Sequence, residues 1–219
     1  MSLRLHDYAP SANCYKVRLL LAQLGREYER VPVDIFAGET LTPEFREKNP
    51  AMTTPVLEYE PGRYLPESAA ILLYLADGTH LLPDDRAERA EVHRWLFFEQ
   101  ANVVPTVASV RFRLLTGRLD PESVSARRRA AFATGVVATV DAHLAGREFA
   151  AAGAYSVADI ALYGYLHVAH EAGVDTAPFE NVARWLDSVR AQPNHVADLE
   201  PYPENSRPGR SRSIYDAQS

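Results

Sequence analysis

Two short motifs within residues 53–75 carry groups suited to holding a small ligand. Thr54-Pro55 stands directly before the apolar Val56-Leu57. The proline therefore occupies the first position of an expected strand, where its missing N–H is tolerated. If the Thr54–Pro55 peptide bond is cis, Thr54 turns its main-chain N–H and C=O outward, where they can pair with a bound backbone.

Glu67-Ser68 places a carboxylate and a hydroxyl at the start of an expected helix. The free amides and the dipole of a helix N-terminus favour a carboxylate ligand, whereas the Glu67 carboxylate favours an ammonium group. An α-amino acid head carries both groups on one carbon, so it suits this pair. Taken alone, the two motifs also fit an ordinary helix cap next to a turn proline.

Together the motifs resemble the glutathione-binding half-site of the glutathione S-transferases, in which a residue–cis-Pro–Val sequence and a later Glu-Ser dipeptide hold glutathione. The resemblance extends over residues 3–196. It implies that Thr54, Pro55, Glu67 and Ser68 bind glutathione as a co-substrate, and it implies no metal ion. It also implies a homodimer, because family dimers form between the α/β domain of one subunit and the helical domain of the other.

Enzymes of this family hold the bound thiol as a thiolate, although a free thiol of pKa about 8.5 is only a few per cent ionised near neutral pH. Lowering that pKa by about two units requires roughly 2.7 kcal/mol of preferential thiolate stabilisation. Residues 9–13 resemble the bacterial nu-type pattern, in which a hydroxyl residue and an asparagine two positions later face the sulfur. The resemblance therefore implies Ser11 and Asn13 as the catalytic donors. Helix N-capping is the alternative role, and the two roles are compatible.

Four further residues modify the expected binding of glutathione. Cys14 would permit a mixed-disulfide mechanism, but its place beyond Ser11 favours a small packed side chain. Thr42 and Thr53 stand where relatives often carry basic residues that hold the glycyl carboxylate of glutathione, so this contact is expected to be weaker or different. Arg128 resembles a ligand-contacting arginine of nu-type relatives, with a solvated helix face as the alternative for its run of three arginines.

These residues lead to three functional hypotheses. The first is a glutathione transferase whose bound thiolate attacks a small electrophile. The second is a glutathione-dependent disulfide reductase that needs no protein cysteine. The third is a non-catalytic interaction protein of the same fold, against which Ser11, Glu67 and Ser68 argue.

The patterns predict two domains that position these groups. Residues 1–77 are expected to form a thioredoxin-like α/β domain with the element order β-α-β-α-β-β-α, and residues 86–202 an all-helical domain. Pro105 should kink or interrupt a long helix over residues 86–115, and residues 156–159 match a capping box before a buried helix. Residues 203–219 have the composition of a flexible tail, which we expect to pack on another surface such as the second subunit.

The overall composition narrows the class of protein. The 219 residues are 47% hydrophobic and 24% charged, as is typical of globular proteins. The net charge of −6 gives no electrostatic reason to expect nucleic acid or a membrane as a partner. The single cysteine excludes an intramolecular disulfide, so a cytoplasmic protein is expected. His167 and His170 lie three residues apart on an expected helix, but only Glu171 is near them, and they do not predict a metal site.

Overall fold

The computed structural model describes residues 3–216. The chain divides into two compact units, the first made of Met1–Leu75 with Val196–Ser219 and the second of Ala76–His195. The helical unit therefore ends before residue 202, because the segment that follows His195 packs with the first unit.

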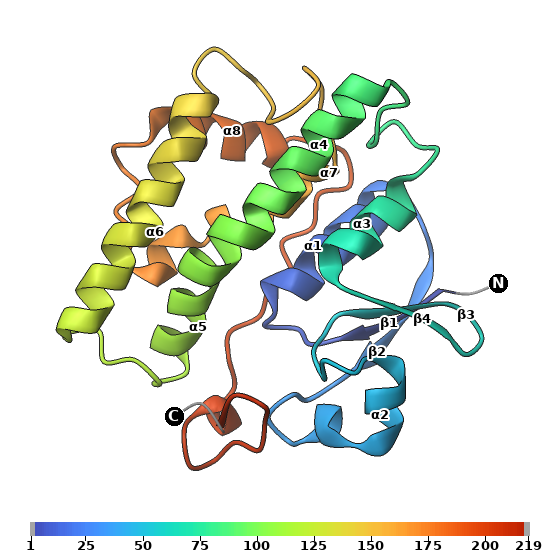
Figure 1. The fold of residues 1–219 in the computed structure, drawn as a ribbon, viewed down its shortest axis with the longest axis vertical. Helices are drawn as coiled ribbons and strands as arrows, with labels where there is room; N and C mark the ends of the chain where they lie inside the picture. Colours follow the sequence, from blue (N-terminus) through green and yellow to red (C-terminus); the bar gives the residue numbers. More distant parts are fainter. Residues whose placement is uncertain (1–2, 217–219) are drawn as a thin grey trace. The chain divides into compact units, whose positions relative to one another are not determined.

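The first unit is an α/β layer structure with the predicted order of elements (Figure 1). Its sheet has the strand order β2-β1-β3-β4, with β1 parallel to β2 and antiparallel to β3, and β3 antiparallel to β4. The expected thioredoxin-like α/β fold is thereby confirmed. The strands are β1 (Leu3–Asp7), β2 (Tyr28–Pro32), β3 (Val56–Glu60) and β4 (Arg63–Pro66), and the helices are α1 (Ala12–Gln23), α2 (Pro43–Lys48) and α3 (Ser68–Ala76).

Helix α1 forms much of the core of this unit. Its apolar stripe, which includes Val17, Leu20 and Leu21, is fully buried. Gly25 follows the C-cap residue Leu24 with a φ of 60°, a left-handed conformation that glycine adopts without strain. The helix therefore ends at a glycine, as is common for α-helices.

The second unit is helical, and the predicted break at Pro105 takes a specific form. Pro105 lies in a π-helical segment, Glu99–Ala108, that joins α4 to α5. The wider turn accommodates a residue that lacks an N–H and would crowd an α-helix. The named helices are α4 (Arg86–Phe98), α5 (Ser109–Leu115), α6 (Val124–His143), α7 (Val157–Leu166) and α8 (Glu180–Arg190).

The predicted capping box precedes α7. The Ser156 hydroxyl accepts a hydrogen bond from the amide of Ala158, and the Asp159 carboxylate accepts one from the amide of Ser156 at 3.0 Å. Asp159 also accepts from the indole Nε1 of Trp185 at 2.9 Å. Since all ten residues of α7 are buried, this cap anchors the helix that runs through the core of the second unit.

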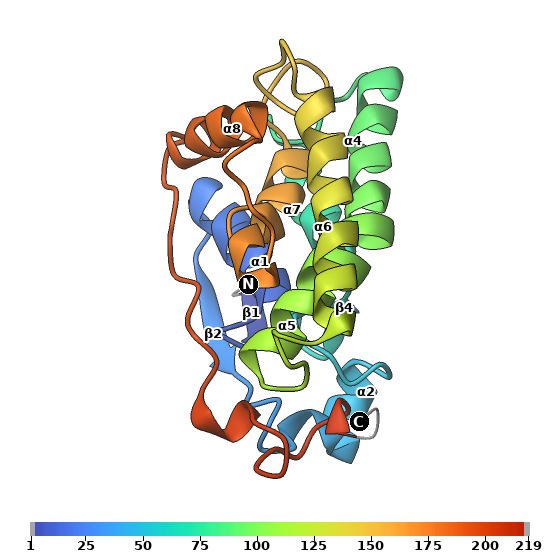
Figure 2. The same cartoon turned by 90° about the vertical axis from the view of Figure 1, so that its left-hand side faces the viewer.

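Residues 196–216, called the C-terminal strap below, extend along the first unit. The Tyr15 hydroxyl donates to the carbonyl of Val196 at 2.7 Å, and Asn205 Nδ2 donates to Asp34 Oδ2 at 2.7 Å. In both cartoon views the strap lies next to the loop between β2 and α2 (Figures 1 and 2). The surface that the tail covers is thus on its own chain, and residues 217–219 of the predicted tail lie outside the described residues.

Within residues 3–216, no helix is both long enough and apolar enough to cross a membrane.

Candidate functional site

The strand register brings the predicted site residues to one end of the sheet. His6, near the end of β1, pairs with Val56 at the start of β3, and Val56 pairs with Pro66 at the end of β4. The loop after β1, the segment before β3 and the start of α3 therefore meet at the same end of the sheet. These three segments contain Ser11 and Asn13, then Thr54 and Pro55, then Glu67 and Ser68.

The Thr54–Pro55 peptide bond is cis, which meets the condition set by the sequence. Among residues 3–216, the main-chain N–H and C=O of Thr54 have no hydrogen-bond partner. Asn49 holds the preceding loop, because its Nδ2 donates to the Thr53 carbonyl at 2.8 Å and to the Thr53 hydroxyl at 3.0 Å. An unpaired, half-exposed main chain is the group that an extended peptide ligand can pair with.

Glu67 and Ser68 differ in exposure at the start of α3. Glu67 is exposed and has a φ of 71°, a left-handed conformation uncommon for glutamate, while its carbonyl accepts the amide of Ile71 at 2.9 Å. Ser68 is only 5% exposed. Its hydroxyl and the first amides of α3 lie where the helix dipole favours an anion.

Ser11 and Asn13 occupy the start of α1. Ser11 is the N-cap of this helix, and its oxygen accepts the amide of Cys14 at 3.3 Å. The capping role is therefore observed, and the same hydroxyl can also donate its hydrogen, for which the Cys14 sulfur is one acceptor. Ser68 Oγ donates to Asn13 Oδ1 at 3.4 Å, which connects the start of α3 with the start of α1.

Cys14 is packed in the interior. It is fully buried, and the amide of Tyr8 donates to its sulfur at 3.4 Å. Burial raises the pKa of the Cys14 thiol to about 12, and hydrogen bonds from Thr54, Tyr8 and Ser11 offset only part of that rise. A thiol with this pKa stays protonated near neutral pH, so Cys14 is a poor nucleophile.

Arg18 holds the loop that carries Ser11, a role that the sequence analysis did not predict. This arginine is 1% exposed and forms ion pairs with Asp7 at 2.7 Å and with Asp198 of the strap at 2.8 Å. Its Nη2 also donates to the carbonyl of Ala9 at 3.2 Å. An arginine within the apolar stripe of a predicted helix was the available signal, because arginine is rarely buried without partners.

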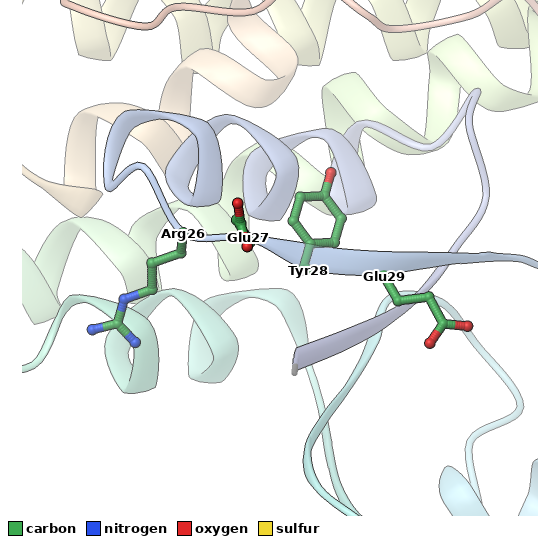
Figure 3. A pocket seen from close by; sticks show the side chains of 4 residues that line it. All are labelled: Arg26, Glu27, Tyr28 and Glu29. Atoms are coloured by element: carbon green, nitrogen blue, oxygen red, sulfur yellow. The ribbon is translucent and has the colours of Figure 1, made fainter. Parts of the chain in front are cut away.

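Two other features concern residues outside this group. Arg128 is exposed on α6 of the second unit, and its contact with a ligand stays a prediction. Figure 3 shows a hollow lined by Arg26, Glu27, Tyr28 and Glu29. Tyr28 pairs with Leu3, so this hollow lies at the opposite end of the sheet from the candidate site.

The described residues contain no group of three or more His, Cys, Asp or Glu side chains arranged to hold a metal ion. His167 Nδ1 lies 2.6 Å from the carbonyl of Tyr163, and the ring stacks on that of Tyr163 at 4.7 Å. Burial lowers the pKa of His167 to about 4. This histidine is therefore engaged in packing within the second unit.

Comparison with known proteins agrees with the fold. Residues 5–79 match the N-terminal domain model of glutathione S-transferases, and residues 130–193 match the C-terminal domain model. Glutathione S-transferase 2 of Anopheles gambiae is 30% identical over 190 residues, which cover 84% of this chain and 88% of the mosquito protein. The chain belongs to the glutathione S-transferase family.

Two solved bacterial structures are similar along almost the whole chain. A possible glutathione S-transferase from Rhodopseudomonas palustris is 41% identical with a TM-score of 0.87, covering 92% of this chain and 100% of that one. A glutathione transferase family member from Pseudomonas fluorescens, solved with two glutathione molecules bound, is 30% identical with a TM-score of 0.79. That match covers 92% of this chain and 93% of the other.

Proposed function

We propose that this protein is a glutathione transferase that ionises bound glutathione and directs the thiolate at a small electrophile. The observation that carries the proposal is the 3.4 Å contact between Ser68 Oγ and Asn13 Oδ1. It joins a helix start suited to an α-amino acid head with a loop of hydrogen-bond donors. Thr54, with its unpaired main chain, contributes the segment between them.

The γ-glutamyl end of glutathione suits Glu67 and Ser68. Its ammonium group complements the exposed Glu67 carboxylate, and its carboxylate can accept the Ser68 hydroxyl and the first amides of α3. The main chain of the cysteinyl residue can pair with Thr54, as a strand pairs with a sheet edge. This arrangement directs the ligand sulfur toward the start of α1.

The donors at the start of α1 suit a thiolate. The Nδ2 group of Asn13 is a hydrogen-bond donor, and the Ser11 hydroxyl can turn its hydrogen from the Cys14 sulfur to the ligand sulfur. Hydrogen bonds to a charged group are worth about 1.5–3 kcal/mol each. One or two of them therefore supply the roughly 2.7 kcal/mol needed to lower a thiol pKa by about two units.

The reaction then requires no protein nucleophile. The thiol proton leaves to solvent, the thiolate attacks the electrophilic carbon, and the leaving group departs as an anion. The deep burial of Cys14 supports a mechanism in which the only reacting sulfur near neutral pH belongs to glutathione.

Turnover of a chlorodinitrobenzene with glutathione tests this proposal directly. Activity that is lost on replacing both Ser11 and Asn13 by alanine, in a protein that still binds glutathione, supports the assigned roles. Calorimetry that detects no glutathione binding at millimolar concentration would contradict the proposal and favour a non-catalytic interaction protein.

A second candidate, disulfide reduction, is favoured by the two glutathione molecules bound to the Pseudomonas fluorescens relative. The first glutathione thiolate would attack a disulfide and release one thiolate, and the second would attack the glutathione sulfur of the resulting mixed disulfide to give glutathione disulfide and release the other thiolate. Comparing kcat/KM for hydroxyethyl disulfide with that for the chlorodinitrobenzene separates the two reactions.

The proposed enzyme acts in the cytoplasm as a homodimer, as the family resemblance implies. Sedimentation of the purified chain at twice its monomer mass supports the dimer, and a monomeric species that retains full activity contradicts it.

A further inference from the structure

The C-terminal strap ends against the loop that follows β2. Asn205 Nδ2 donates to Asp34 Oδ2 at 2.7 Å, and the main-chain amide of Arg212 donates to the carbonyl of Phe36 at 2.7 Å. Arg212 also forms a parallel β-bridge with Ala37. The main chain of Arg212 is therefore fixed to this loop at adjacent residues.

The side chain of Arg212 lies across Gly38. This glycine has a φ of 84°, and a Cβ atom at this position would lie 3.0 Å from Arg212 Cδ and 3.2 Å from Nε. The left-handed conformation favours glycine, and a Cβ atom would crowd the Arg212 side chain. Arg212 is exposed, and its guanidinium has no carboxylate partner within residues 3–216, whereas Arg210 pairs with Glu204 at 3.1 Å.

The order of the strands arranges four segments side by side at one end of the sheet. Glu67-Ser68 follows β4, Thr54-Pro55 precedes β3, Ser11 follows β1, and residues 34–38 follow β2. Neighbouring strands are about 4.8 Å apart, so β4 and β2 are separated by roughly 14 Å. An extended tripeptide spans about 10 Å, and the γ-linkage of glutathione lengthens it further. With its amino-acid head at Glu67-Ser68, its far end therefore points toward the side of β2.

The two threonines at the expected carboxylate-binding positions are engaged in local structure. Thr42 is the N-cap of α2, and its hydroxyl accepts the amide of Phe45 at 3.2 Å. Thr53 accepts hydrogen bonds from Asn49 through its carbonyl and its hydroxyl. Neither residue carries a charge to pair with a ligand carboxylate.

We propose that Arg212 of the C-terminal strap binds the glycyl carboxylate of glutathione and thereby replaces the basic residues absent at positions 42 and 53. The inference rests on the proposed function, because it assumes glutathione in the cradle. The guanidinium is planar and presents paired N–H donors that match a carboxylate. The strap supplies this cation from the far end of the chain, next to the loop after β2.

Calorimetry with two ligands tests this role in the full chain. The ligands are glutathione and glutathione esterified at its glycyl carboxylate. We expect the wild type to bind glutathione about tenfold more tightly than the ester, as one charge-assisted contact predicts. Arg212→Gln should weaken glutathione binding by that factor and leave ester binding unchanged, and Arg210→Gln, the matched control on the strap, should keep the wild-type preference.

The outcomes separate this inference from the proposed function. An Arg212→Gln variant that keeps the wild-type preference for glutathione overturns the role of Arg212 and leaves the transferase proposal intact, as does a wild type that binds both ligands equally. A wild type that binds neither ligand overturns both proposals. Gly38→Ala, which crowds the Arg212 side chain, should also reduce the preference, and circular dichroism reports whether the variant is folded.

Discussion

Ser68 Oγ donates to Asn13 Oδ1 across 3.4 Å, and this contact joins two segments that lie 55 residues apart in the chain. A serine hydroxyl has one hydrogen. When a ligand carboxylate accepts that hydrogen, Asn13 loses a partner, so the two halves of the site are coupled through one side chain. In the proposed glutathione site, a ligand bound at the start of α3 would therefore change the environment of the donors at the start of α1.

Replacing Ser68 by alanine should raise the KM for glutathione about tenfold or more, since one charge-assisted hydrogen bond is worth about 1.5–3 kcal/mol. Steady-state kinetics at saturating electrophile measures the change. Ser125→Ala on α6 of the second unit is the control and should leave KM unaltered. An unchanged KM in Ser68→Ala would remove this residue from the site.

Asn13→Asp should move the pH profile of the thiolate reaction to higher pH. The substitution keeps the shape of the side chain but replaces the donor amide by a negative charge, which disfavours a neighbouring thiolate. The pKa of bound glutathione therefore rises by about one unit or more, and the thiolate fraction near neutral pH falls. Ultraviolet titration of the binary complex measures this pKa, and a value equal to that of the wild type rules out Asn13 as a donor.

Cys14 should be inert in the folded protein. Because burial raises its pKa to about 12, a thiol reagent applied at mildly alkaline pH should label it only after unfolding. Mass spectrometry before and after addition of denaturant measures the labelling. Cys14→Ala should retain full turnover, and a large loss of kcat in a folded Cys14→Ala protein would restore the mixed-disulfide mechanism.

His167 should make the protein less stable as the pH falls. Burial lowers its pKa to about 4, below its ordinary value of 6.5. Between these values the unfolded chain binds a proton that the folded chain excludes, so the free energy of unfolding decreases as the pH falls from about 6.5 to about 4.

Urea unfolding at several pH values measures this effect. His167→Gln should reduce the slope in that window, whereas His170→Gln, at an exposed neighbouring position, should retain it. Identical slopes for wild type and His167→Gln would show that the acid sensitivity arises from other groups.

Much of the secondary structure follows from local sequence patterns. The apolar stripe of α1 and the glycine that ends it, the capping box before α7 and the proline before β3 each depend on a few neighbouring residues. Such features are readable because helix caps and turns form short-range hydrogen bonds. The Glu-Ser pattern and, through the family resemblance, Ser11 and Asn13 likewise indicated the candidate site.

Long-range packing determines the contacts that local sequence patterns do not predict. Three contacts join distant parts of the chain. Ser68 contacts Asn13, and Arg18 is buried between Asp7 and Asp198. The side chain of Arg212 packs against Gly38. The polar composition of residues 203–219 suggested a loose tail, but main-chain hydrogen bonds hold Arg212 to Phe36 regardless of side-chain type. Such contacts depend on sheet register and chain path, which no local window of sequence encodes.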